Sequence, residues 1–293
     1  MKRLFAPFLF AVLLAGCQSP SQEFLIDNPT DAALTLSIDG TDYQVPAHNA
    51  VPVTLPPGEH TLRSARLGEV RVIVYADRKA GLINPTLSDY VLANEIYVTG
   101  EDKLKNFGAI NARIDLDGVT FEGPFSKTHD LFIDKTWTFG VREPFPEVQT
   151  VAHVSDNGGR ISTKIFTPTD FIAYVEQGMG EPGAYQRENP KGFQQATHTL
   201  ETAPQQLPAL APAFEQHAGP LRSLYARHLQ ATSADTQKAL DKEAFNAQMA
   251  FTSATAQAMG QNMGKAMEGY NQFVSDFGQL RGRSALIVAI SKP

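Results

Sequence analysis

The sequence predicts an α+β protein in which antiparallel, sandwich-like β modules are followed by a long α-helical segment and a C-terminal strand. Three observations predict this fold class. The N-terminal half contains short runs of alternating apolar and polar residues, separated by Asp-Gly and Pro-Gly pairs as in β-hairpins. Residues 234–281 place apolar side chains at helical spacing instead. Residues 284–290 then form an apolar run of strand length.

Residues 18–83 are expected to form a small antiparallel β domain. The alternation begins near Phe24, after a short polar stretch, and both Asp39-Gly40 and Pro57-Gly58 are typical of turns between strands. The alternating apolar residues that define the strands are Leu34, Leu36, Ile38, Tyr43, Val45, Val51, Val53, Leu55, Val70, Val72 and Val74.

The turns of this domain also carry a resemblance. Leu-Pro-Pro-Gly-Glu-His-Thr-Leu at 55–62 follows Ile38-Asp39-Gly40. Over residues 34–62 this pattern resembles small envelope-associated β modules that carry the form I-D-G … L-P-x-G-x-H. The resemblance implies a scaffolding or binding role for the domain.

Residues 84–180 are expected to form a second β-rich domain that ends in a helix. The form D-G-x-x-aromatic-x-x-P occurs at 39–46 and again at 117–124, which predicts a hairpin in each domain. An internal repeat and independent use of the same hairpin chemistry both explain this match. The candidate strands of the second domain are 90–98, 109–116, 119–122, 131–133 and 136–141.

Two further features belong to the second domain. Thr167 is a good helix N-cap, with Pro168 at the first helical position, and the helix is expected to stop at Gly178. Trp137, the only tryptophan, lies in an alternating segment and is expected to be a core residue.

Residues 181–232 show little apolar periodicity and are expected to be an irregular connection with a short helix near 220–229. Long irregular segments in compact proteins are usually either functional loops or mobile linkers. The sequence leaves both interpretations open.

Residues 233–293 are expected to form a long helical segment and a closing strand that returns to one of the sheets. Apolar residues recur at spacings of four and three from Phe245 to Leu280, which predicts a coiled-coil-like seam. An unbroken helix would be about 70 Å long at 1.5 Å per residue, so we expect either a break near 260–269 or self-association. A possible interaction surface is Met249, Met259, Met263, Tyr270, Phe273 and Phe277.

Residues 244–264 carry no charged side chain, so membrane insertion is an alternative for this segment. Asn246, Gln248, Gln257, Gln261 and Asn262 argue against it, because unpaired amides are costly in hydrocarbon. We therefore expect packing within the chain or between copies of it.

The first 17 residues predict export of the chain and its cellular location. Lys2 and Arg3 precede an apolar stretch that is too short to span a bilayer, which is typical of a secretory signal peptide. Leu-Ala-Gly-Cys at 14–17 resembles the lipobox of bacterial lipoproteins, which implies cleavage before Cys17 and acylation of that cysteine with lipid such as palmitate. An ordinary signal peptide with a coincidental cysteine is the alternative.

The single cysteine and the residue after it are consistent with a lipid-anchored protein. Cys17 has no partner for an internal disulfide. Gln18 follows it in place of the aspartate that, in the enterobacterial rule, retains lipoproteins at the inner membrane. The resemblance therefore implies a membrane anchor at the cell outer membrane, with the body facing the periplasm.

Charge argues against nucleic acid as a partner. Cleavage before Cys17 removes two basic residues and no acidic one, which leaves 23 basic against 31 acidic residues and a formal charge of −8. No cluster of Lys or Arg offers a phosphate-binding patch.

The sequence motifs that could indicate a catalytic or cofactor-binding site are weak. Gly178-Met-Gly180-Glu-Pro-Gly183 has the form G-x-G-x-x-G, but it follows a predicted helix and not a strand, so we expect a turn cluster. His129-Asp130 is the nearest acid–base pair, although adjacent residues on a strand point to opposite faces. We predict no catalytic, metal or cofactor residue, and an enzyme is the less favoured class.

Two functions are carried forward from the sequence. The first is a lipoprotein that acts as a protein-binding or structural module, with a protein partner or self-association through the C-terminal helix. A narrower form of it is an immunity or inhibitor lipoprotein against an envelope toxin. The second is a lipid-anchored envelope hydrolase. The hydrolase hypothesis predicts a concave pocket beside the loop at 178–212, in which His129 or another histidine lies close to a carboxylate or hydroxyl group.

Overall fold

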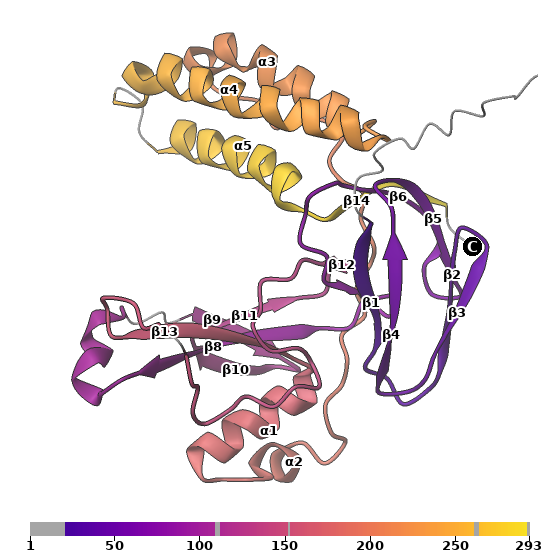
Figure 1. Cartoon of the computed structure of the whole chain (residues 1–293), viewed down its shortest axis with the longest axis vertical. Helices are drawn as coiled ribbons and strands as arrows, with labels where there is room; N and C mark the ends of the chain where they lie inside the picture. Colours follow the sequence, from indigo (N-terminus) through magenta and orange to yellow (C-terminus); the bar gives the residue numbers. More distant parts are fainter. Residues whose placement is uncertain (1–20, 109–111, 152, 261–263, 292–293) are drawn as a thin grey trace, which may run out of the picture.

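The structure, a computed structural model, describes residues 21–108, 112–151, 153–260 and 264–291. It is a mixed α+β protein with several antiparallel sheets, followed by helices and a final strand (Figure 1). A helical part and a second β-rich part both project from the central pair of sheets (Figure 1).

The central part consists of two sheets that share one core. Phe24, Ile26 and Val53 of one sheet and Leu36 and Val72 of the other belong to the same buried cluster. The first sheet has the order β12-β7-β1-β4, and its strands are β1 (Gln22–Asn28), β4 (Asn49–Leu55), β7 (Leu82–Ile83) and β12 (Phe132–Ile133). The second has the order β14-β6-β5-β2-β3, and its strands are β2 (Leu34–Ile38), β3 (Thr41–Val45), β5 (Gly58–Ser64), β6 (Gly68–Val74) and β14 (Ala285–Ser291).

Both predicted Asp-Gly hairpins are present. Asp39 and Gly40 have φ of 51° and 81° between β2 and β3, and Asp117 and Gly118 have φ of 53° and 78° between β9 (Ala112–Leu116) and β10 (Val119–Gly123). Positive φ at both central residues defines the two-residue turn whose twist matches the flanking strands. In each case a proline follows the second strand, as the sequence pattern requires.

The second β-rich part is built around β8 (Tyr90–Val98). This strand pairs with β11 (Phe125–Thr128) on one side and with β13 (Gly159–Phe166) on the other. The helix α1 (Pro168–Met179) begins where predicted, because the Thr167 hydroxyl accepts a hydrogen bond from the Asp170 backbone N–H. The remaining elements of this part are the 3-10 helix η1 (Glu101–Asn106) and the short helix α2 (Ala184–Glu188).

The predicted strand at 136–141 is not formed. Phe139 makes an isolated bridge to Lys164, and the backbone of residues 138–139 forms hydrogen bonds with that of Thr163 and Ile165 in β13. The residues that follow are bound by a side chain. The Lys164 ammonium donates hydrogen bonds to the carbonyl oxygens of Gly140, Val141 and Glu143 at 2.8, 3.0 and 2.6 Å. Trp137 is buried, as expected.

The two β-rich parts are joined more closely than a boundary at residue 84 suggests. Strand β12 comes from the second predicted domain but pairs with β7 in the first central sheet. The Tyr90 hydroxyl donates to the buried Asp27 carboxylate, which also pairs with Arg142. Burial and the neighbouring charge of Asp27 raise the pKa of Tyr90 well above its ordinary value.

The C-terminal helical segment is a three-helix arrangement and not one long helix. The helices are α3 (Pro212–His228), α4 (Ala234–Met259) and α5 (Lys265–Gly282). The change from α4 to α5 falls within the predicted break, and α3 begins eight residues before its predicted start at Pro220. Phe214, Phe251 and Phe273, one from each helix, share a buried cluster.

The predicted coiled coil is not supported, although the apolar residues predicted for its seam are buried in α5; in α4 they are not. Leu240, Ala244 and Phe251 of α4 are buried, whereas Phe245 and Met249 are 58% and 57% exposed. The seam assumed one continuous register, but packing against α3 selects a different face of α4. No helix among the described residues has the length and apolar character needed to cross a membrane.

The C-terminal strand closes the fold as predicted. Strand β14 pairs antiparallel with β6, with Leu286 opposite Ile73. Ala285 belongs to the core between the sheets, whereas Leu286 belongs to the helical core. This strand therefore attaches the helices to the central sheets.

The segment 189–211, which we call the strap, is irregular but packed. Leu200 contacts the core between the sheets, and Leu207 is buried in the helical core. The Ala203 N–H donates to the carbonyl oxygen of Ile287 in β14 at 2.8 Å. The strap therefore passes over the junction between the sheets and the helices.

Candidate functional site

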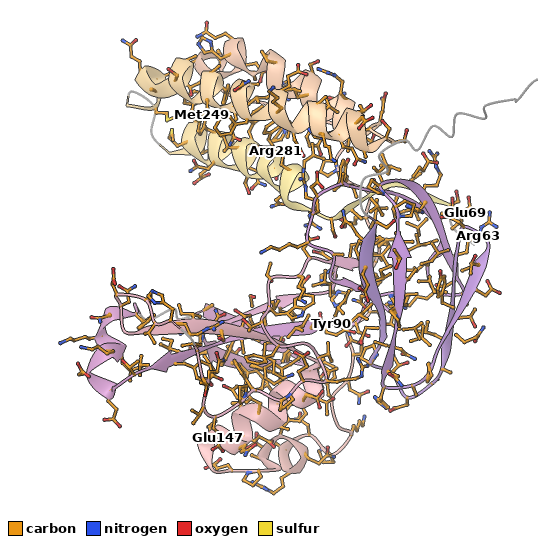
Figure 2. The ribbon with its side chains drawn as sticks, in the orientation of Figure 1. Arg63, Glu69, Tyr90, Glu147, Met249 and Arg281 are labelled. Atoms are coloured by element: carbon orange, nitrogen blue, oxygen red, sulfur yellow. The ribbon has the colours of Figure 1, made fainter. Side chains whose placement is uncertain are left out.

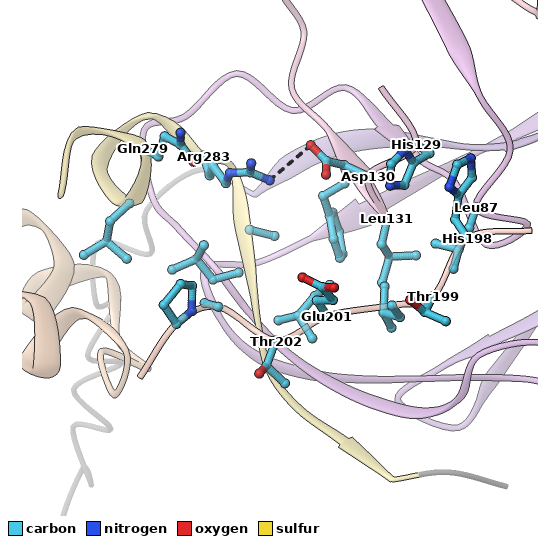
Figure 3. A pocket seen from close by; sticks show the side chains of 18 of the residues that line it. Leu87, His129, Asp130, Leu131, His198, Thr199, Glu201, Thr202, Gln279 and Arg283 are labelled. Atoms are coloured by element: carbon cyan, nitrogen blue, oxygen red, sulfur yellow. Dashed lines mark hydrogen bonds and ion pairs between the residues drawn. The ribbon is translucent and has the colours of Figure 1, made fainter. Parts of the chain in front are cut away.

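A pocket of about 430 Å³ lies at this junction (Figure 3). The strap lines one wall through residues 197–204, and the end of α5 and the start of β14 line the others. His129 and the residues that lead into β12 complete it. Its polar groups include Glu201, Asp276 and Arg283, and its apolar groups include Leu131 and Leu200.

Two imidazoles and a carboxylate meet at the edge of this pocket. His198 Nε2 lies 2.9 Å from Asp89 Oδ1, and His129 Nδ1 lies 3.9 Å from the same oxygen. The rings of His129 and His198 are stacked, with centroids 3.7 Å apart and planes 5° apart. Figure 3 shows the two histidines next to each other, on separate chain segments.

A side-chain-stabilised turn places Asp89 at the start of β8. The Asn84 amide donates to the carbonyl oxygen of Ser88 at 2.8 Å, and the Asn84 Oδ1 accepts from the Ser88 N–H at 3.1 Å. Leu87 within this turn has a positive φ of 51°. Asparagine is favoured in such turns because its side chain bonds the local backbone. The turn fixes where the carboxylate of the next residue points.

The histidines reach Asp89 from two other segments. His129 follows β11 directly, in a bend where the Thr128 hydroxyl accepts a hydrogen bond from the Asp130 N–H. His198 belongs to the strap, and its carbonyl oxygen accepts a hydrogen bond from Arg66 at 3.2 Å. Three segments that are distant in sequence therefore converge on one carboxylate.

The three side chains of the cluster differ in their exposure to solvent. The Asp89 side chain is 3% exposed, that of His198 18% and that of His129 45%. A buried carboxylate must be compensated by hydrogen bonds or positive charge. His198 contacts Asp89 Oδ1, and the Lys127 ammonium lies 3.9 Å from Asp89 Oδ2. The cluster therefore extends from the buried Asp89 carboxylate to the solvent-accessible ring of His129.

His129 and Asp130 do not act as a pair. His129 faces Asp89, whereas Asp130 accepts a hydrogen bond from Arg283 at 3.2 Å (Figure 3). This agrees with the expectation that adjacent side chains point to different sides. Arg283 follows α5 directly, so its contact with Asp130 links the helical part to the wall of the pocket.

The residues of the predicted interaction surface separate into three groups. Tyr270, Phe273 and Phe277 are buried in the helical core, so they cannot form a surface. Met249 is exposed on α4 (Figure 2). Met259 is partly buried. Met263 and Cys17, the residue predicted to be lipidated, lie outside the described residues.

The glycine motif at 178–183 is a turn cluster, as predicted. Gly178 lies in the last turn of α1, and Gly180 caps that helix with a φ of 74°. Gly183, with a φ of 77°, precedes the short α2. The motif therefore ends one helix and does not follow a strand.

No local sequence pattern identifies Asp89 or His198 as site residues. Neither lies in a motif, and the members of the cluster are separated by 40 and 69 positions. His198 does lie in the segment that was considered as a functional loop. No family model matches the chain, and neither a curated protein nor a solved structure is significantly similar to it.

Proposed function

We propose that this chain is a lipid-anchored protein of the bacterial outer membrane, with its body facing the periplasm. The lipobox-like residues at 14–17 support this address. Strand β1 begins at Gln22, five positions after Cys17, so the folded body follows the acylated residue closely. The two central sheets, which share one core, serve as a β-sandwich body in this proposal.

The proposed activity is protein binding through self-association, and the outer face of α4 carries it. Phe245 and Met249 are exposed one helical turn apart, and Thr252 and Ala256 continue the same stripe at exposed positions. Large apolar side chains exposed side by side are typical of interaction surfaces.

A second copy of the chain is the partner that this stripe fits best. Residues 244–259 carry no charged side chain, so the stripe offers nothing to select a charged partner. In a dimer related by a two-fold axis, the stripe of one copy would cover the stripe of the other, so Phe245 and Met249 of both copies would leave the solvent together.

The test uses the fact that Cys17 is the only cysteine. Full-length Met249→Cys should form disulfide-linked dimers in the cell envelope, seen on non-reducing gels. Gln216→Cys, at an exposed position of α3, is the matched control and should remain monomeric. Adding Phe245→Glu to Met249→Cys should abolish the dimer, because two glutamates would face each other. Equal crosslinking at positions 249 and 216 would contradict the proposal.

The pocket favours a second candidate, a lipid-anchored envelope hydrolase. It brings His129 and His198 together with a carboxylate beside the strap, which is the arrangement expected of a lipid-anchored hydrolase. A histidine oriented by a carboxylate is the usual general base of hydrolases. Hydrolysis of envelope polymers or lipids by the full chain would favour this candidate.

A further inference from the structure

We infer that Asp89, His129 and His198 form a binding site for a divalent transition-metal ion, with zinc as the ion that the donor set suits best. The ligand atoms of these three residues all lie within 4.8 Å of one another. Zinc is bound in proteins by imidazole nitrogen and carboxylate oxygen, and imidazole also suits other ions of the same series.

The first observation is that two imidazoles share one carboxylate oxygen. The hydrogen bond from His198 at 2.9 Å already occupies Asp89 Oδ1, yet His129 also turns Nδ1 toward it from 3.9 Å. Stacking of the two rings at 3.7 Å brings both imidazole nitrogens to the same carboxylate oxygen. Two nitrogens and one carboxylate oxygen are thereby gathered from three chain segments, and rotation of one ring out of the parallel stack would direct all three toward one ion.

The second observation is that small movements complete the site. Zinc bonds of about 2.0–2.1 Å in a tetrahedral arrangement separate neighbouring donor atoms by roughly 3.4 Å. Closing the cluster therefore requires ring rotations and shifts of about 1 Å, since the donors lie within 4.8 Å now. His129, at 45% exposure, has the freedom to make them.

The third observation concerns the other carboxylate oxygen. Lys127 Nζ lies 3.9 Å from Asp89 Oδ2 and donates a hydrogen bond to the carbonyl oxygen of Asp115 at 2.8 Å. The charge of Lys127 is therefore nearest to Oδ2, while both imidazoles are nearest to Oδ1. Oδ1 is the oxygen that the ion would bind.

The position of the site gives it a role in holding the strap. His198 comes from the strap, whereas Asp89 and His129 flank strands β8 and β11 of the sheet. An ion bound by all three would fix the strap against that sheet. The coordination position left by three protein ligands would face the pocket that His129 and His198 line, as in sites that bind water or substrate.

The experiment measures zinc binding to the untagged full chain by titration calorimetry. Cys17→Ser in every sample removes the only thiol, so no thiolate competes for the ion. One zinc ion per chain is expected. His129→Ala, His198→Ala and Asp89→Asn should each weaken binding by more than the roughly 10–100-fold that loss of an outer-shell contact costs.

The matched control is His48→Ala. His48 Nε2 lies 2.8 Å from Asp31 Oδ1, so it is an exposed histidine–aspartate pair remote from the site. Its loss should leave zinc binding unchanged. His129→Ala is the deciding variant, because a half-exposed ring can be removed without unfolding the chain.

A second measurement tests the site with a readout other than binding affinity. Hydrogen exchange of strap amides near His198 should slow on addition of zinc in the parent chain and not in the three variants. Absence of a stoichiometric site in the parent, or equal loss in His48→Ala, would overturn the inference. The inference does not rest on pairing through α4, and Phe245→Glu should bind zinc as the parent does.

Discussion

His228 is a histidine that the fold keeps without a hydrogen-bond partner. It is 1% exposed, and neither ring nitrogen has a partner among the residues that the structure describes. Burial lowers the pKa of His228 below its ordinary value. Asp241 opposes this shift, while the nearby charges of Arg78, Arg281 and Arg227 add to it. The folded state therefore favours the neutral ring.

This residue predicts a loss of stability in acid. Because the unfolded chain binds the proton more readily than the folded chain, the free energy of unfolding should fall as the pH drops below about 6.5. His228→Leu should remove that part of the pH dependence, and should stabilise the chain at pH 7.5 by about 1 kcal/mol since no unpaired nitrogen remains buried.

Urea unfolding at several pH values measures this effect. His217→Leu, on the same helix, is the control and should keep the pH dependence of the parent. An unchanged slope in His228→Leu would show that other groups cause the acid sensitivity.

The candidate site shows where prediction from sequence ends at this scale. His129 was singled out because an acidic residue follows it, but the acid that it faces is Asp89, 40 positions earlier. The pairing depends on how β8 and β11 align, and no local pattern encodes that alignment. The prediction for Cys17, in contrast, depends on its immediate neighbours alone.

At the scale of elements, Lys164 binds the end of a segment that the sequence predicts to be a strand. Its three hydrogen bonds to the carbonyl oxygens of residues 140, 141 and 143 attach that end to β13, next to the backbone hydrogen bonds of residues 138–139. Lys164→Met should destabilise the chain by roughly 2–3 kcal/mol, because buried carbonyl groups lose a charged donor.

Denaturant unfolding followed by Trp137 fluorescence measures this loss, since Trp137 lies in the same segment. Arg160→Met, at an exposed position of β13, should change the stability little. A similar loss in both variants would mean that β13 itself, and not the Lys164 contacts, is sensitive.

The predicted strands and β13, one of the strands that were missed, differ in how apolar and polar residues alternate. In β2, β4 and β6 the apolar residues of the pattern face the core, so period two identifies them. In β13 the polar Ser162 and Lys164 are buried, and Ile161 is 44% exposed. The alternation there is inverted, so it does not predict a strand. In α4 the period was right and the face was wrong, because α3 determines which face is covered.

At the scale of the whole molecule, β14 connects two cores. Leu286 lies in the helical core opposite Ile73 of β6, while Ala285 faces the core between the sheets. Leu286→Ala should cost about 2–5 kcal/mol for the lost burial and the cavity. It should also separate the unfolding of the helices from that of the sheets.

Two probes distinguish these parts. Far-ultraviolet circular dichroism reports mainly on the helices, and the single tryptophan reports on the β-rich part. In Leu286→Ala the two transitions should no longer coincide. Ile161→Ala, which truncates an exposed side chain of β13, should leave the relation between the two probes as in the parent. Coincident transitions in Leu286→Ala would mean that other contacts join the cores.

The place of β14 also governs when the molecule can finish folding. Residues 285–291 pair with β6 at 68–74, more than 200 positions earlier in the chain. Until residue 291 has been made, or has crossed a membrane if the chain is exported, the side of β6 that pairs with β14 remains an open edge of the sheet. Such edges can pair with other chains. The order of synthesis therefore leaves this sheet open for most of the chain's emergence, and a factor that shields β6 during that interval would protect the yield of folded protein.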